Sequence, residues 1–227
     1  MTHTLNRRGL EKDRPGEEIC VLCMIHHKNK NEKSSKAMRE LVKTIIRYEP
    51  NNLIGRPLGV SNEDIVGLCG AAGVATAVFT DKDAVRKLVQ EIKAKGFGLS
   101  GISVVLSGLF SDIRDVCEYA GLTEHTSNYP VGIYGKTSLL PDYITLEIAT
   151  QCGHGLVSRH YIKDVVRRIS KGRLTAQEGA ELLSKPCVCG IVNKKRTEEI
   201  LLKMVEQSPF VEGNEVNYAV RRKRKFS

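Results

Sequence analysis

Two short segments of this sequence combine cysteine, histidine and glycine at spacings that suit a metal site. Residues 152–155 read Cys-Gly-His-Gly, and residues 186–190 read Pro-Cys-Val-Cys-Gly. Glycine lets the backbone bend tightly and approach a bound ion closely. Together the two segments offer three thiolates and one imidazole. These soft ligands are typical of zinc sites and of iron–sulfur clusters.

Two inorganic groups fit this ligand set. Bound to Cys152, Cys187 and Cys189, an iron–sulfur cluster of the 4Fe-4S type would keep one iron without a protein thiolate, and that iron could act as a Lewis acid on a substrate. With His154 as the fourth ligand, the same residues form a closed structural zinc site. We slightly favour the iron–sulfur cluster over zinc, because two cysteine-bearing turns at the ends of helices or strands suit the binding of a cluster. In a metal-free interpretation these are simply buried cysteines in tight turns.

The remaining cysteines give weaker signals. Cys20 and Cys23 lie in an apolar, strand-like run, where residues three apart point to opposite faces, so one of them is expected to face the core and a separate metal site is the minority interpretation. Cys69 lies in the glycine-rich stretch 67–73, whose spacing is not the dinucleotide fingerprint. We interpret these glycines as close-packing positions and Cys69 as an optional fourth thiolate. Cys117 is expected in the core.

Four polar residues are further site candidates. Glu124 and His125 lie in a polar loop and could act as a catalytic acid–base pair, because loops on a rigid scaffold often carry function. Lys136 and Arg159 could bind a carboxylate or a phosphate of a substrate. The alternative for each of the four is a solvated surface side chain.

The net charge of +9 indicates an anionic partner, and we expect a small anionic molecule. Five of the positive charges lie in residues 221–225, where a nucleic acid could also bind. The absence of Trp and the 5% aromatic content argue against base stacking. No apolar run reaches membrane-spanning length and the N-terminus does not resemble a signal peptide, so a cytoplasmic protein with reduced thiols and no membrane contact is expected.

The elements that must position these residues follow from periodicity. The sequence predicts an α/β fold, with a single mixed sheet and flanking helices, followed by a mainly helical C-terminal part. We expect an N-terminal lead over 1–18, an α/β domain over 19–208 and a basic tail over 209–227. Strands are predicted at 19–25, 74–79 and 102–106, around 131–134 and at 143–148. Helices are predicted at 36–48, from Thr80, after Ser111, from Ser158, from Thr175 to Pro186, and around 200–205.

Three functions remain in competition at this stage. The first is a cytoplasmic metalloenzyme that acts on a small anionic substrate, and the sequence does not choose between lyase or dehydratase chemistry and electron transfer. The second is a zinc-stabilised nucleic-acid-binding module, suggested by the isoelectric point near 9.2. The third is a metal-free scaffold or subunit.

Overall fold

The structure is a computed structural model, and it describes residues 6–10 and 18–207. Of the expected N-terminal lead, it therefore describes residues 6–10 and 18. The expected basic tail, with its cluster of charges at 221–225, lies outside the described residues.

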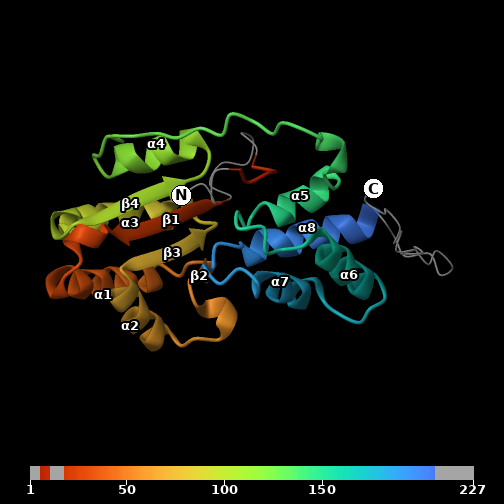
Figure 1. The fold of residues 1–227 in the computed structure, drawn as a ribbon, viewed down its shortest axis with the longest axis horizontal. Coiled ribbons are helices and arrows are strands. Elements are labelled where there is room, and N and C mark those ends of the chain that lie inside the picture. The colour runs from red at the N-terminus through yellow and green to blue at the C-terminus, as the bar shows by residue number, and fades with distance from the viewer. Residues whose placement is uncertain (1–5, 11–17, 208–227) are drawn as a thin grey trace, which may run out of the picture.

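A four-stranded sheet forms the first half of the molecule, with the order β2-β3-β1-β4 (Figure 1). Its strands are β1 (Ile19–Ile25), β2 (Asn52–Leu53), β3 (Val74–Phe79) and β4 (Ile102–Ser107). Each hydrogen-bonded pair is antiparallel, and Cys20 lies opposite Val78 and Ser107. The strands predicted at 19–25 and 74–79 are confirmed at both ends. The short β2 was not predicted, because it lies in a segment rich in Pro and Gly.

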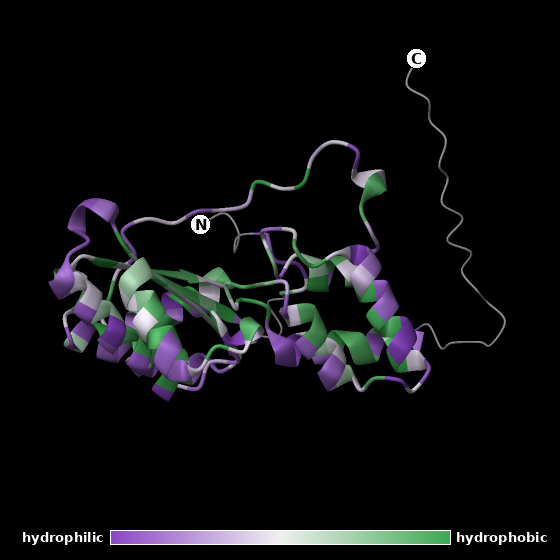
Figure 2. Ribbon diagram, turned by 60° about the horizontal axis from the view of Figure 1, so that its bottom comes forward, coloured by the Kyte–Doolittle hydropathy of each residue, from purple (hydrophilic) through white to green (hydrophobic). Residues whose placement is uncertain are grey.

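Four helices pack on one face of this sheet. They are α1 (Glu32–Arg47), α2 (Asn62–Ala72), α3 (Lys82–Ala94) and α4 (Phe110–Tyr119). Every second residue of β1, from Ile19 to Ile25, shares a buried cluster with their apolar side chains, and we call this cluster the first core. In Figure 2 the strands are mostly hydrophobic, whereas the helices alternate between hydrophobic and hydrophilic residues. This is the pattern of amphipathic helices that cover an apolar sheet face.

Four more helices form the second half of the molecule. They are α5 (Tyr143–Ala149), α6 (Arg159–Ser170), α7 (Ala176–Ser184) and α8 (Lys194–Gln207). Their apolar residues form a second core, which Cys20 and Val78 join from the sheet. Short 3-10 turns complete the chain as η2 (His27–Asn29), η3 (Arg56–Leu58), η4 (Phe97–Ser100) and η5 (Thr137–Leu139). The predicted fold class, an α/β sheet with flanking helices followed by a mainly helical part, is thus confirmed, but the sheet is antiparallel where a mixed sheet was predicted.

The strand predicted at 143–148 is wrong, because this segment is helix α5. Asp142 caps the helix, and its side chain accepts a hydrogen bond from the backbone N–H of Thr145 at 2.9 Å. Ile144 and Ile148 are four residues apart, so they share one helical face and both pack on the second core. The spacing of Ile144, Leu146 and Ile148 is compatible with a strand, and the spacing of Ile144 and Ile148 also fits a helix. The cap at Asp142 favours the helix. The segment 131–134 is also not a strand, and it is exposed.

Capping residues set several other helix ends. Ser158 caps α6 as predicted, and Thr175 and Glu178 form the predicted capping box of α7. Helix α1 starts earlier than predicted, because Asn31 caps it and forms a capping box with Ser34. Helix α3 is capped by Asp81 and not by Thr80.

Candidate metal centre

The structure brings the two predicted ligand segments together. The Sγ atoms of Cys187 and Cys189 lie 3.6 Å apart, and the Sγ atom of Cys189 lies 3.8 Å from Nδ1 of His154. The thiol of Cys152 also interacts with that of Cys187. The four residues therefore form one continuous chain of contacts, although the two segments are 35 residues apart in the sequence. We call these four side chains the thiol cluster.

Each ligand segment is a tight turn between two helices. In the first turn, which joins α5 to α6, the backbone N–H of Gly155 donates to the carbonyl of Cys152 at 2.9 Å. In the second, which joins α7 to α8, the N–H of Gly190 donates to the carbonyl of Cys187 at 2.8 Å. Both glycines have a positive φ, which glycine adopts at little cost. The first turn therefore follows a helix, and not a strand as the sequence predicted.

The second turn is docked onto the edge of the sheet. The N–H of Gly55 donates to the carbonyl of Val188 at 3.1 Å, and the hydroxyl of Thr76 donates to the carbonyl of Cys189. Gly190 lies against the backbone of Leu53 so closely that a Cβ atom would collide with it. The turn can keep this contact only with glycine at position 190.

A buried arginine joins the two turns to each other. Arg7 donates from Nη1 to the carbonyl of Gln151 at 2.6 Å and from Nη2 to the carbonyl of Ile191 at 2.7 Å. Gln151 precedes the first ligand, and its side-chain oxygen accepts from the N–H of Asn193 at 2.9 Å. These bonds tie the backbone beside one turn to the backbone beside the other. The sequence did not indicate a role for Arg7 in the site, because Arg7 is more than 140 residues away from both turns along the chain.

The thiol cluster is buried on one side and open on the other. Cys152 and Cys187 are 2% and 0% exposed, Cys189 is half-buried and His154 is exposed. The hydrogen bond between the Cys187 and Cys189 thiols lowers the pKa of Cys189 below its ordinary value. The hydrogen bond to Cys187, together with burial, raises the pKa of Cys152. Of the three thiols in the cluster, only that of Cys189 has a lowered pKa, so it most readily becomes a thiolate.

Among the described residues, no group of three or more His, Cys, Asp or Glu side chains is already arranged to hold a metal ion. The thiols instead contact one another in pairs. A shared metal would replace the hydrogen bonds between the thiols, because only the thiolate is a metal ligand. The ligand types and the two short separations fit such a group, and the side chains would have to reorient to surround it.

The other cysteines divide between the two cores. Cys20 and Cys23 point to opposite faces of β1, as the strand spacing predicted, and burial raises the pKa of each thiol to about 12. Cys20 lies on the side of the thiol cluster and interacts electrostatically with Cys187. Cys69 lies in the first core near Cys23. The extra thiol next to the cluster is therefore Cys20, whereas the sequence had suggested Cys69. Cys117 is buried, as expected.

The other four candidates lie on or beside the long connection between α4 and α5. Glu124 is 3.9 Å from Arg114, and Nδ1 of His125 is 3.1 Å from the hydroxyl of the neighbouring Thr126. Lys136 is exposed and immediately precedes η5. Arg159, at the start of α6, donates to the carbonyl of Leu139 at 3.1 Å. These contacts are local to the connection, and an acid–base or substrate-binding role for these residues stays a prediction.

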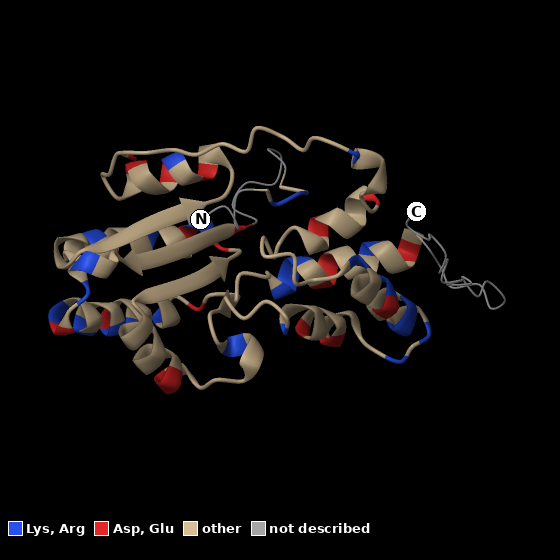
Figure 3. Cartoon of the chain, in the orientation of Figure 1, with Lys and Arg blue, Asp and Glu red and all other residues tan. Residues whose placement is uncertain are grey.

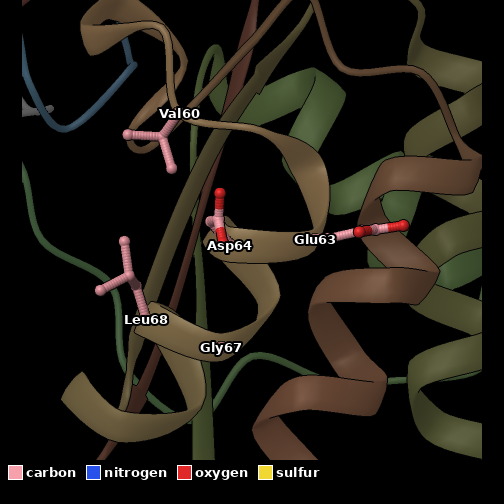
Figure 4. Close-up of a pocket in the computed structure, with 5 residues that line it drawn as sticks. All are labelled: Val60, Glu63, Asp64, Gly67 and Leu68. Carbon is pink, nitrogen blue, oxygen red and sulfur yellow. The ribbon is translucent and has the colours of Figure 1, made fainter.

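An open surface pocket of about 540 Å³ lies elsewhere, at the start of α2 (Figure 4). Its lining consists of Val60, Glu63, Asp64, Gly67 and Leu68. None of these residues belongs to the thiol cluster. Of the sequence features, only the glycine-rich stretch 67–73 reaches this pocket, and in the structure that stretch is largely helical.

Within the described part of the chain, no helix combines the length and the apolar character that crossing a membrane requires. Comparison with models of known protein families, with curated protein sequences and with solved structures finds no match to this chain.

Proposed function

We propose that this chain is a cytoplasmic metalloprotein that binds one metal ion through Cys152, Cys187, Cys189 and His154. The observation that carries the proposal is the spacing of the thiol cluster. A tetrahedral zinc ion with Zn–S bonds of about 2.3 Å separates two ligand sulfurs by about 3.8 Å. The Cys187 and Cys189 sulfurs are 3.6 Å apart, close to that separation. All seven cysteines are free thiols, which suits a reducing compartment.

The same spacing favours zinc over the 4Fe-4S cluster. Each cysteine ligand of a four-iron cluster binds a different iron, so the body of the cluster separates the ligand sulfurs. Cys187 and Cys189 would have to move apart to seat a cluster. Their turn is held by hydrogen bonds from Gly55 and Thr76 to two successive carbonyls, those of Val188 and Cys189. A single ion requires a much smaller adjustment.

A metal at this position would fasten the helical half to the sheet. Its ligands come from both turns, and the second turn is itself docked on the sheet. With all four ligands bound, the site is closed and stabilises the fold. His154 is the most exposed of the four ligands. If it did not bind the metal, the fourth coordination position of the metal would therefore face solvent. In that form the site could accept a small anion, and Lys136 and Arg159 are the proposed contacts for it.

Metal analysis of the purified protein tests the proposal. We expect about one zinc per chain after purification without oxygen, and loss of this zinc in Cys187→Ser. Cys117→Ser is the matched control, because it removes a buried thiol outside the thiol cluster and should leave zinc unchanged. Iron and sulfide in similar amounts would support the cluster instead. A wild-type protein with neither element at stoichiometry would contradict the proposal.

A second candidate function, nucleic-acid binding, draws support from the charge of α6 and the turn after it. Residues 159–173 contain six Lys or Arg and one Asp. In Figure 3 the ribbon of α6 and of the turn that follows is blue at several positions, which marks Lys and Arg residues. Binding to generic RNA or DNA that weakens steeply with salt, and that survives deletion of 221–225, would favour this function. Binding that disappears with the deletion would assign it to the tail.

A further inference from the structure

Next to the thiol cluster, the described residues include three fully buried charged side chains, two positive and one negative. The side chains of Arg7, Glu18 and Arg196 are at most 3% exposed. Glu18 Oε1 accepts from Arg7 Nε at 2.5 Å and from Arg196 Nη1 at 3.0 Å. One carboxylate thus serves two guanidinium groups, which leaves a net charge of +1. Among the described residues, Glu147 adds a carboxylate 3.8 Å from Arg196, and because its side chain is 21% exposed it compensates the charge only from the partly hydrated edge of the group.

An excess buried charge is costly unless an opposite charge accompanies it. A zinc ion bound by three thiolates and a neutral imidazole carries a net charge of −1, because two positive charges meet three negative ones. The buried charges of the arginine pair and the metal centre would therefore offset each other. The guanidinium of Arg7 also interacts electrostatically with the thiols of Cys20 and Cys187.

Arg7 is also placed to hold the ligand turns in position. Its two Nη atoms donate to carbonyls on either side of the thiol cluster, one beside Cys152 and one just beyond Gly190. Groups that contact metal ligands in this way orient them, and their removal typically lowers metal affinity. Arg7 therefore combines a geometric role with a charge.

We propose that Arg7, which shares the carboxylate of Glu18 with Arg196, is the positioning and charge-compensating residue of the metal centre. The inference rests on the proposed metal-binding function. It adds that zinc affinity depends on the net charge of this buried group, as well as on the four ligands. It also assigns a role in the site to the N-terminal segment.

Zinc affinity of the full chain, measured by competition with a chelator, tests the proposal. Arg7→Gln lowers the buried charge by one, and we expect zinc to bind about 10- to 100-fold more weakly. Glu18→Gln raises the charge by one and should bind zinc at least as tightly as wild type. Gln has nearly the same shape as Glu, and its side-chain oxygen can still accept from Arg7 and Arg196. Arg8→Gln is the matched control, since Arg8 contacts the network through its backbone.

The double variant separates charge from structure. Arg7→Gln with Glu18→Gln restores the wild-type net charge, so its zinc affinity should return to within a few-fold of wild type. A purely structural role predicts instead that the double variant is at least as weak as Arg7→Gln. A double variant as weak as Arg7→Gln would overturn the inference, and so would a clear loss of zinc affinity in Glu18→Gln. The Glu18→Gln measurement remains possible if Arg7→Gln does not fold. A wild-type protein that binds no zinc would overturn the proposed function itself.

Discussion

The first core and the junction around the thiol cluster hold the chain together by different means. The first core is a large apolar cluster, which includes the thiols of Cys23 and Cys69 and is formed mainly by the sheet and by α1 to α4. The junction is built from hydrogen bonds and buried charges, with Arg7, Glu18, Gln151 and Asn193 at its centre. Apolar burial is non-directional and tolerates small shifts, whereas a buried polar network requires every partner. The junction should therefore be the part that depends on a ligand.

Metal removal should produce the largest difference between the two regions. Structural zinc contributes about 10–16 kcal/mol of apparent binding free energy in small zinc domains. When a chelator removes the metal, we expect the backbone amides of α5 to α8 to exchange hydrogen faster, while those of β1, β3 and α1 stay protected. Uniform loss of protection, or none, would contradict this division.

Leu88→Ala should affect the other region. Leu88 is fully buried in the first core, so its truncation should lower the free energy of unfolding by about 2–5 kcal/mol. Zinc content should stay unchanged, because the thiol cluster lies in the other half. Urea unfolding combined with metal analysis measures both. If zinc is lost together with stability, the two regions are more strongly coupled than their contacts indicate.

Gly190→Ala tests the docking of the second turn. Alanine at a positive φ costs roughly 1–3 kcal/mol, and here its Cβ would also strike the backbone of Leu53. We expect a loss of at least about 2 kcal/mol in the free energy of unfolding, together with weaker zinc binding. Gly155→Ala is the control, because it has a similar φ but open space around the added carbon. Equal effects of the two variants would argue against the contact.

The smallest expected effect on stability comes from loss of the ion pairs of Glu91 on the surface of the first half of the molecule. Hydrogen bonds from Lys95, Tyr48 and Arg47 lower the pKa of Glu91 from 4.5 to about 2. A lowered pKa stabilises the folded state above about pH 4.5, and this contribution is lost as the pH falls toward 2. Glu91→Gln should therefore be up to about 1 kcal/mol less stable than wild type at pH 7, with a shrinking difference below pH 4.5. A difference that does not change with pH in urea unfolding would contradict this assignment.

The same contrast explains what the sequence could predict. Strand β1, strand β3 and the cap at Ser158 follow from local patterns, because period and capping are properties of neighbouring residues. The convergence of Cys152 with Cys187 was inferred from residue types, and the structure does bring them together. Arg7, Gln151 and Asn193 could not be found in this way, because their partners are distant in the sequence and nothing local marks a buried polar contact.

X-ray absorption at the zinc edge of the purified protein tests the central claim most directly. The account predicts one zinc with three sulfur ligands at about 2.3 Å and one nitrogen ligand at about 2.0 Å. Cys187→Ser should lose this signature, whereas Cys117→Ser should keep it. A zinc ion surrounded only by oxygen and nitrogen, or iron with iron neighbours in place of zinc, would contradict the account.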